Sequence, residues 1–197
     1  MKNIEKNLKY IKEIKAEDIE WTKLFGAYSC GRKIGEDIKS DNLLNLEILK
    51  NIRGEIEHQS TLWSLTPFTM IFLIRQLEKE YGEKKEEYCY ILQIYKLIVE
   101  TIKDIKNEYF VEESIEDLEV YPEMRCLFNI DIDLEDFDDE EEYIEVHFEE
   151  EDLEREYNSS FYYTNFVIEN SKDIIKKLLN SEDKDIKNLA EEILENF

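Results

Sequence analysis

Residues 63–80 read WSLTPFTMIFLIRQLEKE, and this stretch decides the fold. Its apolar residues recur at helical spacing, so it predicts a strongly apolar helix. Pro67 fits the first turn of that helix, where no backbone N–H is needed. The most apolar part, residues 62–74, is too short to cross a bilayer and contains Thr66 and Thr69, so we expect no membrane-spanning segment. The apolar residues of the helix are Phe68, Ile71, Phe72, Ile74 and Leu77.

The segments on both sides repeat apolar residues at the same spacing and predict further amphipathic helices. The chain contains only 5 Gly and 2 Pro, which favours helix over strand. Helices joined by loops of a few residues pack as antiparallel neighbours, so the sequence predicts a mainly α fold. The predicted helices cover residues 3–14, 17–29, 32–39, 43–57, 83–107, 162–179 and 184–194.

Polar residues and one glycine indicate where some of these helices begin or end. Residues 40–42, Ser-Asp-Asn, are N-cap candidates for the helix over residues 43–57. Residues 181–183, Ser-Glu-Asp, precede the last helix in the same way. Gly31 is the expected C-terminal cap of the helix over residues 17–29.

The length and the cysteine usage fit one intracellular domain. A chain of 197 residues can bury a full core, so we expect a single domain over residues 1–197. Cys30, Cys89 and Cys126 lie far apart and form no CxxC pair, which argues against a disulfide framework or a zinc site. The N-terminus, MKNIEKNLKYIKEIK, lacks the apolar core of a signal peptide. We therefore expect a cytoplasmic protein.

Negative charge is concentrated in an acidic insertion at about residues 111–157. This segment holds 22 Asp and Glu residues against Arg125 and Arg155, so it contributes −20 of the total charge of −24. The rest of the chain is close to neutral. An acidic surface repels nucleic acid and anionic lipid, so the expected partner is a basic protein, with neither direct nucleic-acid binding nor membrane binding.

Two short runs in the acidic segment alternate apolar and polar residues. The first covers residues 128–134 and the second covers residues 144–148. A period of two is typical of strands, and residues 135–142 would form the turn between them. The pattern favours a β-hairpin with one acidic face, and a helix for either run is the alternative.

Residues 19–77, with Trp21, Ala27-Tyr28 and His58-Gln59, and residues 174–194 resemble a family of HEAT-like bacterial proteins. The resemblance implies a toxin-immunity or related interaction protein. Residues 19–77 share a Trp, an Ala-Tyr pair, an Asp between two helices and a His-Gln-x-Thr motif with that family. Ser60 stands where the family has Gly, and Ile71 stands where it has Pro. Residues 174–194 are similar to a generic HEAT repeat. The matching residues of the first stretch are Trp21, Ala27, Tyr28, Asp41, His58, Gln59, Thr61, Trp63, Phe72 and Leu73.

The resemblance implies HEAT-like stacked antiparallel helix pairs. One helix pair cannot bury its apolar stripe alone, so pairs stack into an arc with a concave groove suited to protein partners. Within it we interpret His58, Gln59, Thr61 and Trp63 as a structural motif. The imidazole of His58 and the amide of Gln59 would bond exposed backbone at a helix corner.

The sequence does not predict an enzyme, a cofactor or a metal site. His58 and His147 are the only histidines, and neither has the HExxH spacing of a zinc protease. Carboxylates from Asp131 to Glu142 fall at positions 1, 3, 5, 9 and 12 of an EF-hand loop. The sixth position, however, is Asp136, where the sharp turn of such a loop needs Gly.

An aromatic cluster follows the acidic segment, at residues 157–166. It is either core packing or an interface in which Tyr162 and Tyr163 act as anchors.

These features favour an immunity protein that neutralises a cognate toxin, for example a nuclease, through an acidic surface. A phage-type inhibitor that mimics nucleic acid and blocks a host defence nuclease is the alternative. The predicted contact residues are Asp131, Asp133, Asp136, Asp138, Asp139, Glu140, Glu141, Glu142, Glu145, Tyr162 and Tyr163.

Overall fold

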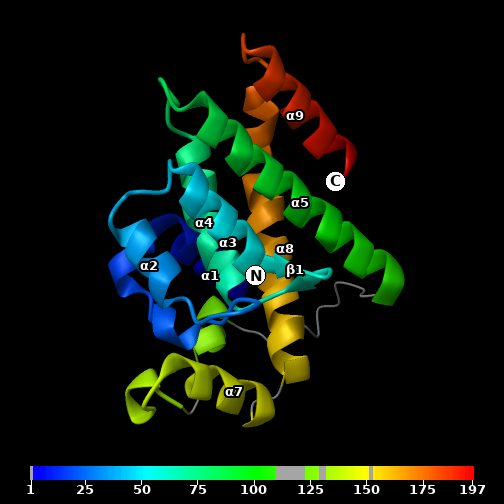
Figure 1. The fold of residues 1–197 in the computed structure, drawn as a ribbon. Coiled ribbons are helices and arrows are strands. Elements are labelled where there is room, and N and C mark those ends of the chain that lie inside the picture. Colours follow the sequence, from blue (N-terminus) through cyan, green and yellow to red (C-terminus); the bar gives the residue numbers. More distant parts are fainter. Residues whose placement is uncertain (1, 110–122, 129–131, 151–152) are drawn as a thin grey trace.

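A computed structural model describes residues 2–109, 123–128, 132–150 and 153–197, and these are mainly helical (Figure 1). The predicted mainly α fold class is therefore confirmed. The helices are α1 (Lys2–Glu13), α2 (Arg32–Lys39), α3 (Leu46–Ile56), α4 (Leu65–Leu77), α5 (Lys85–Tyr109), α7 (Glu140–Glu150), α8 (Leu153–Leu178) and α9 (Lys184–Glu195). Four 3₁₀ turns are η1 (Ala16–Asp18), η2 (Trp21–Lys23), η3 (Met124–Phe128) and η4 (Leu134–Asp136).

The core is built around α4, the helix of the strongly apolar stretch. All of its 13 residues except Arg75 are buried. It packs against α3, α5 and α8, so it has no face that needs polar residues. Arg75 itself donates hydrogen bonds of 2.8 Å to the backbone oxygens of Ile11 and Ile14, which fixes the end of α1.

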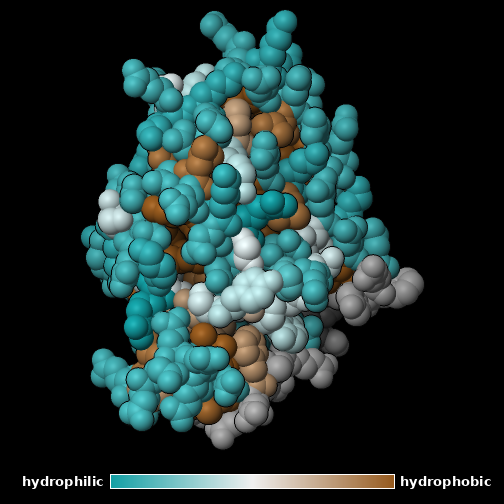
Figure 2. Space-filling view, in the orientation of Figure 1, coloured by the Kyte–Doolittle hydropathy of each residue, from teal (hydrophilic) through white to brown (hydrophobic). Residues whose placement is uncertain are grey.

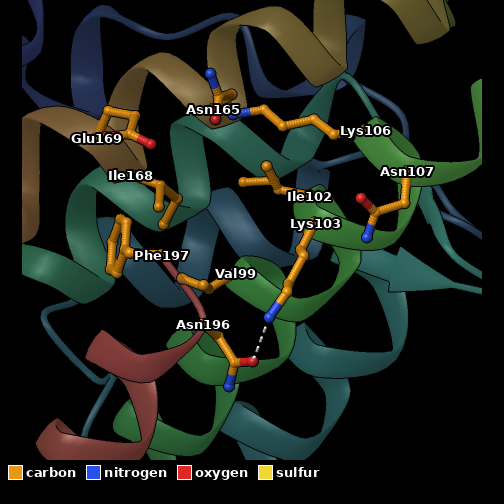
Figure 3. A pocket seen from close by; sticks show the side chains of 10 residues that line it. All are labelled: Val99, Ile102, Lys103, Lys106, Asn107, Asn165, Ile168, Glu169, Asn196 and Phe197. Atoms are coloured by element: carbon orange, nitrogen blue, oxygen red, sulfur yellow. Dashed lines mark hydrogen bonds between the residues drawn. The ribbon is translucent and has the colours of Figure 1, made fainter. Parts of the chain in front are cut away.

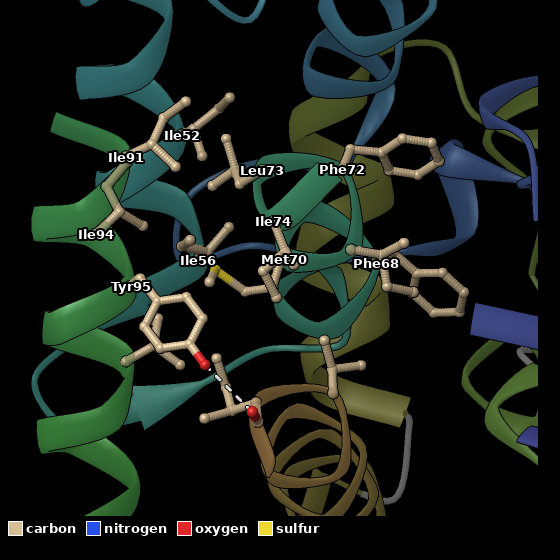
Figure 4. Close-up of a cluster of buried hydrophobic side chains, with 14 of the residues drawn as sticks. Ile52, Ile56, Phe68, Met70, Phe72, Leu73, Ile74, Ile91, Ile94 and Tyr95 are labelled. Atoms are coloured by element: carbon tan, nitrogen blue, oxygen red, sulfur yellow. Dashed lines mark hydrogen bonds between the residues drawn. The ribbon is translucent and has the colours of Figure 1, made fainter. Parts of the chain in front are cut away.

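Side chains from three helices meet in the part of the core shown in Figure 4. The helix α3 contributes Ile52 and Ile56 and α5 contributes Ile91 and Ile94, all fully buried. The hydroxyl of the buried Tyr95, on α5, lies 2.9 Å from Ser171 Oγ on α8, so its polar atom is satisfied within the core.

Consecutive helices form stacked pairs, as predicted. The helices α8 and α9 pack against each other, and α5 packs against α9 (Figure 1). The predicted cap at residues 181–183 is confirmed, because Asp183 Oδ1 accepts the backbone N–H of Asp185 at 3.0 Å and that of Ile186 at 3.5 Å. Lys85 Nζ, at the start of α5, lies 2.8 Å from Asp183 and 2.7 Å from Asp185, so these ion pairs join α5 to the start of α9.

The predicted helix over residues 17–29 is wrong. Ile19, Trp21, Leu24 and Phe25 are buried from two 3₁₀ turns, η1 and η2, and the loop segments beside them, whereas Tyr28 is exposed. Trp21 Nε1 donates to the backbone oxygen of Ala16 at 2.8 Å, and an isolated β-bridge joins Phe25 to Cys30. These contacts satisfy the backbone without a helix. The next helix also begins later than predicted, because Asn45, and not residues 40–42, caps α3.

The predicted acidic β-hairpin is wrong as well, because residues 144–148 lie inside helix α7. Of the first run, Phe128 ends η3 and Leu134 begins η4, while residues 129–131 lie outside the described residues. The helix that remained as the alternative is correct for the second run. A run of five residues shows too few repeats to separate a period of two from a helical period.

A short hairpin occurs instead at the predicted polar corner. Strand β1 (Glu57–His58) pairs antiparallel with β2 (Thr61–Leu62). The two turn residues, Gln59 and Ser60, both have a positive φ, of 53° and 61°. Such a turn favours Gly or Asn, so the Gly that the resembling family has in place of Ser60 fits this geometry.

Helix α7 lies at one end of the molecule, opposite the connection between α4 and α5 (Figure 1). It is not part of the main core and packs on a second, smaller cluster of the buried residues Phe25, Cys30 and Tyr143. Hydrophilic residues cover most of α7 in the view of Figure 2.

Candidate protein-binding surface

Helix α7 separates its residues into a buried face and an acidic face. Tyr143 and His147, one helical turn apart, are fully buried. Glu141, Glu142 and Glu145 are exposed on the other side of the helix. The helical period therefore produces the acidic face that the hairpin was expected to provide, with different residues turned outward.

Several of the predicted contact residues make bonds within the chain. Lys23 Nζ lies 2.9 Å from Asp133 Oδ1. Asp139 Oδ1 accepts the backbone N–H of Glu142 at 2.9 Å, at the start of α7. Asp131 lies outside the described residues. Asp133 and Asp139 thus support the position of this segment.

Glu140 also joins α7 to the body of the protein. Its Oε1 accepts a hydrogen bond from Cys30 Sγ at 3.3 Å, and its Oε2 lies 3.8 Å from Arg32 Nη1. Burial raises the pKa of the Cys30 thiol to about 11, and the hydrogen bond to Glu140 adds to this effect. The thiol therefore stays protonated and remains a donor at neutral pH.

The remaining carboxylates of this segment are exposed, and they form what we call the acidic surface. None of them makes an ion pair with another described residue, and the cations that do reach this segment, Lys23 and Arg32, pair with Asp133 and Glu140 instead. Their charge is therefore available to a partner. The acidic surface consists of Glu135, Asp136, Asp138, Glu141, Glu142 and Glu145.

The EF-hand-like spacing does not form a metal site within the described part of the chain. There, no three His, Cys, Asp or Glu side chains lie close enough together to hold a metal ion.

Aromatic contacts and one hydrogen bond hold α7 on the body. The ring of Tyr143 packs against Phe25 and Phe137, with centroid distances of 5.2 Å and 5.3 Å. Its hydroxyl donates to the backbone oxygen of Thr22 at 3.0 Å. The loop that was predicted as a helix is thus the platform on which α7 lies.

His147 is a buried residue whose place the sequence analysis missed. Its ring stacks on Phe25 with a centroid distance of 3.5 Å and an interplanar angle of 3°. Its Nε2 lies 2.8 Å from Oε2 of Glu156, on α8. The strand reading put His147 on the outward face, whereas its spacing of four from Tyr143 would have put both residues on one helix face.

Some buried polar atoms at this junction, within the histidine–glutamate pair and on Trp63, have no hydrogen-bond partner among the described residues. They include His147 Nδ1, Glu156 Oε1 and Trp63 Nε1. Trp63 packs against Phe148 and Tyr157, with centroid distances of 5.8 Å and 5.5 Å. Each such buried polar atom costs free energy at the junction of α7 and α8.

The two predicted tyrosine anchors are not equivalent. Tyr163 is fully buried in the main core, so its prediction as a contact residue is wrong. Tyr162 is half-buried and packs against that core. The core-packing alternative therefore describes Tyr163.

His58 does not bond exposed backbone, as was predicted, but pairs with a side chain. One of its ring nitrogens, Nδ1, lies 2.9 Å from the hydroxyl of Tyr28, and the ring centroids are 5.0 Å apart. Thr61 faces His58 across the hairpin, and Gln59 is exposed at the turn. Tyr28 is 62% exposed and was not predicted as a contact residue.

One hollow, of about 190 Å³, lies between α5, α8 and α9 (Figure 3). Lys103 Nζ donates to Asn196 Oδ1 at 3.1 Å on one side of it. Its volume is below the roughly 300–1,000 Å³ of ordinary ligand pockets, so we do not assign it a small molecule.

Within the described part of the chain, no helix is both long and apolar enough to cross a membrane. Compared with family models, with curated proteins and with solved structures, the chain matches none of them. The HEAT-like resemblance therefore stays a prediction, and the function has to be argued from the acidic surface itself.

Proposed function

We propose that this protein binds a basic protein through its acidic surface and inhibits it, as an immunity protein does with a cognate toxin. The observation that carries the proposal is the set of six exposed carboxylates, at residues 135–145, that have no ion pair among the described residues. Three of these, Glu141, Glu142 and Glu145, are presented by one helix whose other face is anchored.

The electrostatics favour association with a positively charged surface. Like charges held close together repel one another, and a partner that brings Lys or Arg relieves this repulsion. Complementary charge also speeds the encounter of two proteins. An enzyme that acts on nucleic acid binds phosphates with Lys and Arg, so an acidic inhibitor covers the same groups that its substrate needs. A nuclease is therefore the toxin class that suits this surface best.

The free cysteines support a proposed location in the cytoplasm. Cys30, Cys89 and Cys126 are all free thiols. Free thiols and no disulfide are usual in the reducing cytoplasm, and we place the protein there.

The proposal can be tested by capture of partners from a lysate of the host cell. The bait carrying Glu141→Gln, Glu142→Gln and Glu145→Gln should lose the captured basic protein, because three charges leave the acidic surface. A matched control changes Glu78, Glu80 and Glu83 to Gln, which removes the same charge at the opposite end of the molecule (Figure 1).

The captured protein is then purified and its activity is measured with and without this chain. We expect wild type and the control variant to inhibit it, and the α7 variant to inhibit at least tenfold less, which corresponds to about 1.4 kcal/mol. Equal inhibition by the α7 variant and by wild type would contradict the proposal. Whether the partner is a toxin or a host defence nuclease follows from its identity.

A further inference from the structure

The backbone of the loop over residues 25–29 is fully hydrogen-bonded at its N–H groups. Each of its five backbone N–H groups has an acceptor. Phe25 donates to Ser64 Oγ at 2.9 Å, and Gly26 donates to the backbone oxygen of Ser29 at 2.8 Å. The remaining three donate to a single residue, Glu55, so one buried residue fixes the tip of the loop.

Glu55 is only 8% exposed and binds the loop with both its backbone and its side chain. Its backbone oxygen accepts from Ala27 at 2.9 Å, and its Oε2 accepts from Tyr28 and Ser29, each at 3.1 Å. A Cβ on Gly26 would lie 2.5 Å from Glu55 Oε2, so this close approach needs glycine.

This rigid loop carries Tyr28, the most exposed large hydrophobic residue in the described part of the chain. Its hydroxyl is bonded to His58, on the β1–β2 hairpin, so the ring is fixed at both ends. Rigid, exposed aromatic rings are typical anchors in protein interfaces, because little conformational entropy is lost when they bind.

The loop is also next to the acidic surface. Phe25 and Cys30, joined by the β-bridge, both contact α7, Phe25 through Tyr143 and Cys30 through Glu140. The loop that carries Tyr28 and the helix that presents Glu141, Glu142 and Glu145 are thus neighbours in the fold.

We infer that Tyr28 receives an arginine side chain of the basic partner on its free ring face. The inference rests on the proposed function, because the partner is taken to be basic. A guanidinium group stacks on a tyrosine ring by cation–π attraction, and arginine does so more readily than lysine. His58 positions the ring, and the carboxylates of α7 supply the long-range attraction.

The test uses two peptides of equal charge, hexa-arginine and hexa-lysine, and isothermal titration calorimetry at low salt. The Kd of hexa-lysine divided by the Kd of hexa-arginine measures the preference for arginine. Tyr28→Leu should reduce this ratio about two- to fivefold, as expected for the loss of one exposed cation–π contact. Tyr28→Phe, which keeps the ring, should retain most of the preference.

A matched control is Ile4→Ala, since Ile4 is the other exposed large hydrophobic residue, at 37%. This change should leave the ratio as in wild type. Circular dichroism and thermal melting show that each variant is folded. If Tyr28→Leu has the wild-type ratio, the inference is overturned.

The acidic surface is tested separately with the same peptides. Changing Glu141, Glu142 and Glu145 to Gln should weaken both peptides equally and leave their ratio unchanged. If it weakens neither, the proposed function fails even where Tyr28 sets the preference. If neither peptide binds wild type, both ideas fail.

Discussion

Replacement of His147 by phenylalanine should destabilise the junction of α7 and α8, although phenylalanine can keep the stacking on Phe25. The change removes the 2.8 Å contact with Glu156 and leaves a carboxylate, only 13% exposed, without its partner. A hydrogen bond to a charged group contributes about 1.5–3 kcal/mol, so we expect a loss of about 2–3 kcal/mol in the free energy of unfolding.

The double variant makes the prediction specific. Glu156→Leu alone leaves the buried imidazole without an acceptor and should cost about 1–3 kcal/mol. With both changes neither member of the pair is left without its partner, and two apolar side chains of similar size replace the pair. The double variant should therefore lose about 1 kcal/mol or less, which gives a coupling free energy of about 2 kcal/mol or more.

Urea unfolding followed by circular dichroism measures the global loss. Fluorescence of Trp63 measures the junction, because this residue packs against Phe148 of α7 at a centroid distance of 5.8 Å. Trp21 is the other tryptophan and lies in the main core, so Trp21→Phe serves as the common background. If the losses of the two single variants simply add in the double variant, the buried pair is not an energetic unit and the reasoning is refuted.

Three further changes test other parts of the fold. Ser60→Gly should stabilise the protein by about 0.5–1 kcal/mol, because Ser60 has a φ of 61°; an unchanged thermal midpoint would contradict this. Asn45→Ala should cost about 1 kcal/mol in urea unfolding, since Asn45 Oδ1 caps α3 by accepting from Glu47 and Ile48, whereas Asn45→Asp should cost little. Hydrogen bonds from Lys85 lower the pKa of Asp183, so the stabilisation by this carboxylate is complete above about pH 4, its unfolded pKa, and is lost as the pH falls through the lower folded value. Asp183→Asn still caps α9, and it should make the free energy of unfolding depend less on pH between pH 2 and pH 5. An unaltered slope would contradict a role of the Asp183 carboxylate in this pH dependence.

Much of the helical framework could be predicted because long periodic segments specify it. Helix α2 was predicted with its observed bounds of Arg32–Lys39, and the apolar stretch around α4 did become the centre of the core. The cap by Asp183 was also predicted, because a side-chain oxygen before an apolar repeat has a local and specific role. In each case the signal lies within a few residues of the element.

Features that depend on distant contacts could not be predicted in the same way. The apolar residues around Trp21 suit a helix by spacing, but bonds within the turns and to residues such as Ser64 satisfy the backbone without one. The pairing of Tyr28 with His58 joins residues 30 positions apart. Nothing near either residue in the sequence indicates the other.

The acidic segment shows why charge was predicted better than geometry. Its composition predicts an exposed negative surface whether it folds as strands or as a helix. Which carboxylates remain available depends on Lys23, Arg32 and Cys30, which engage Asp133 and Glu140 from more than 100 positions away. The sequence therefore predicted that this region is acidic, but it did not predict which of its carboxylates stay free of ion pairs.

The division of α7 into two faces has a practical consequence. The outward residues Glu141, Glu142 and Glu145 make no ion pair among the described residues, while Tyr143 and His147 hold the helix in place. Outward positions can then be randomised in a library without disturbing the attachment of the helix. Selection from such a library would yield binders of altered selectivity that differ at only a few positions of α7.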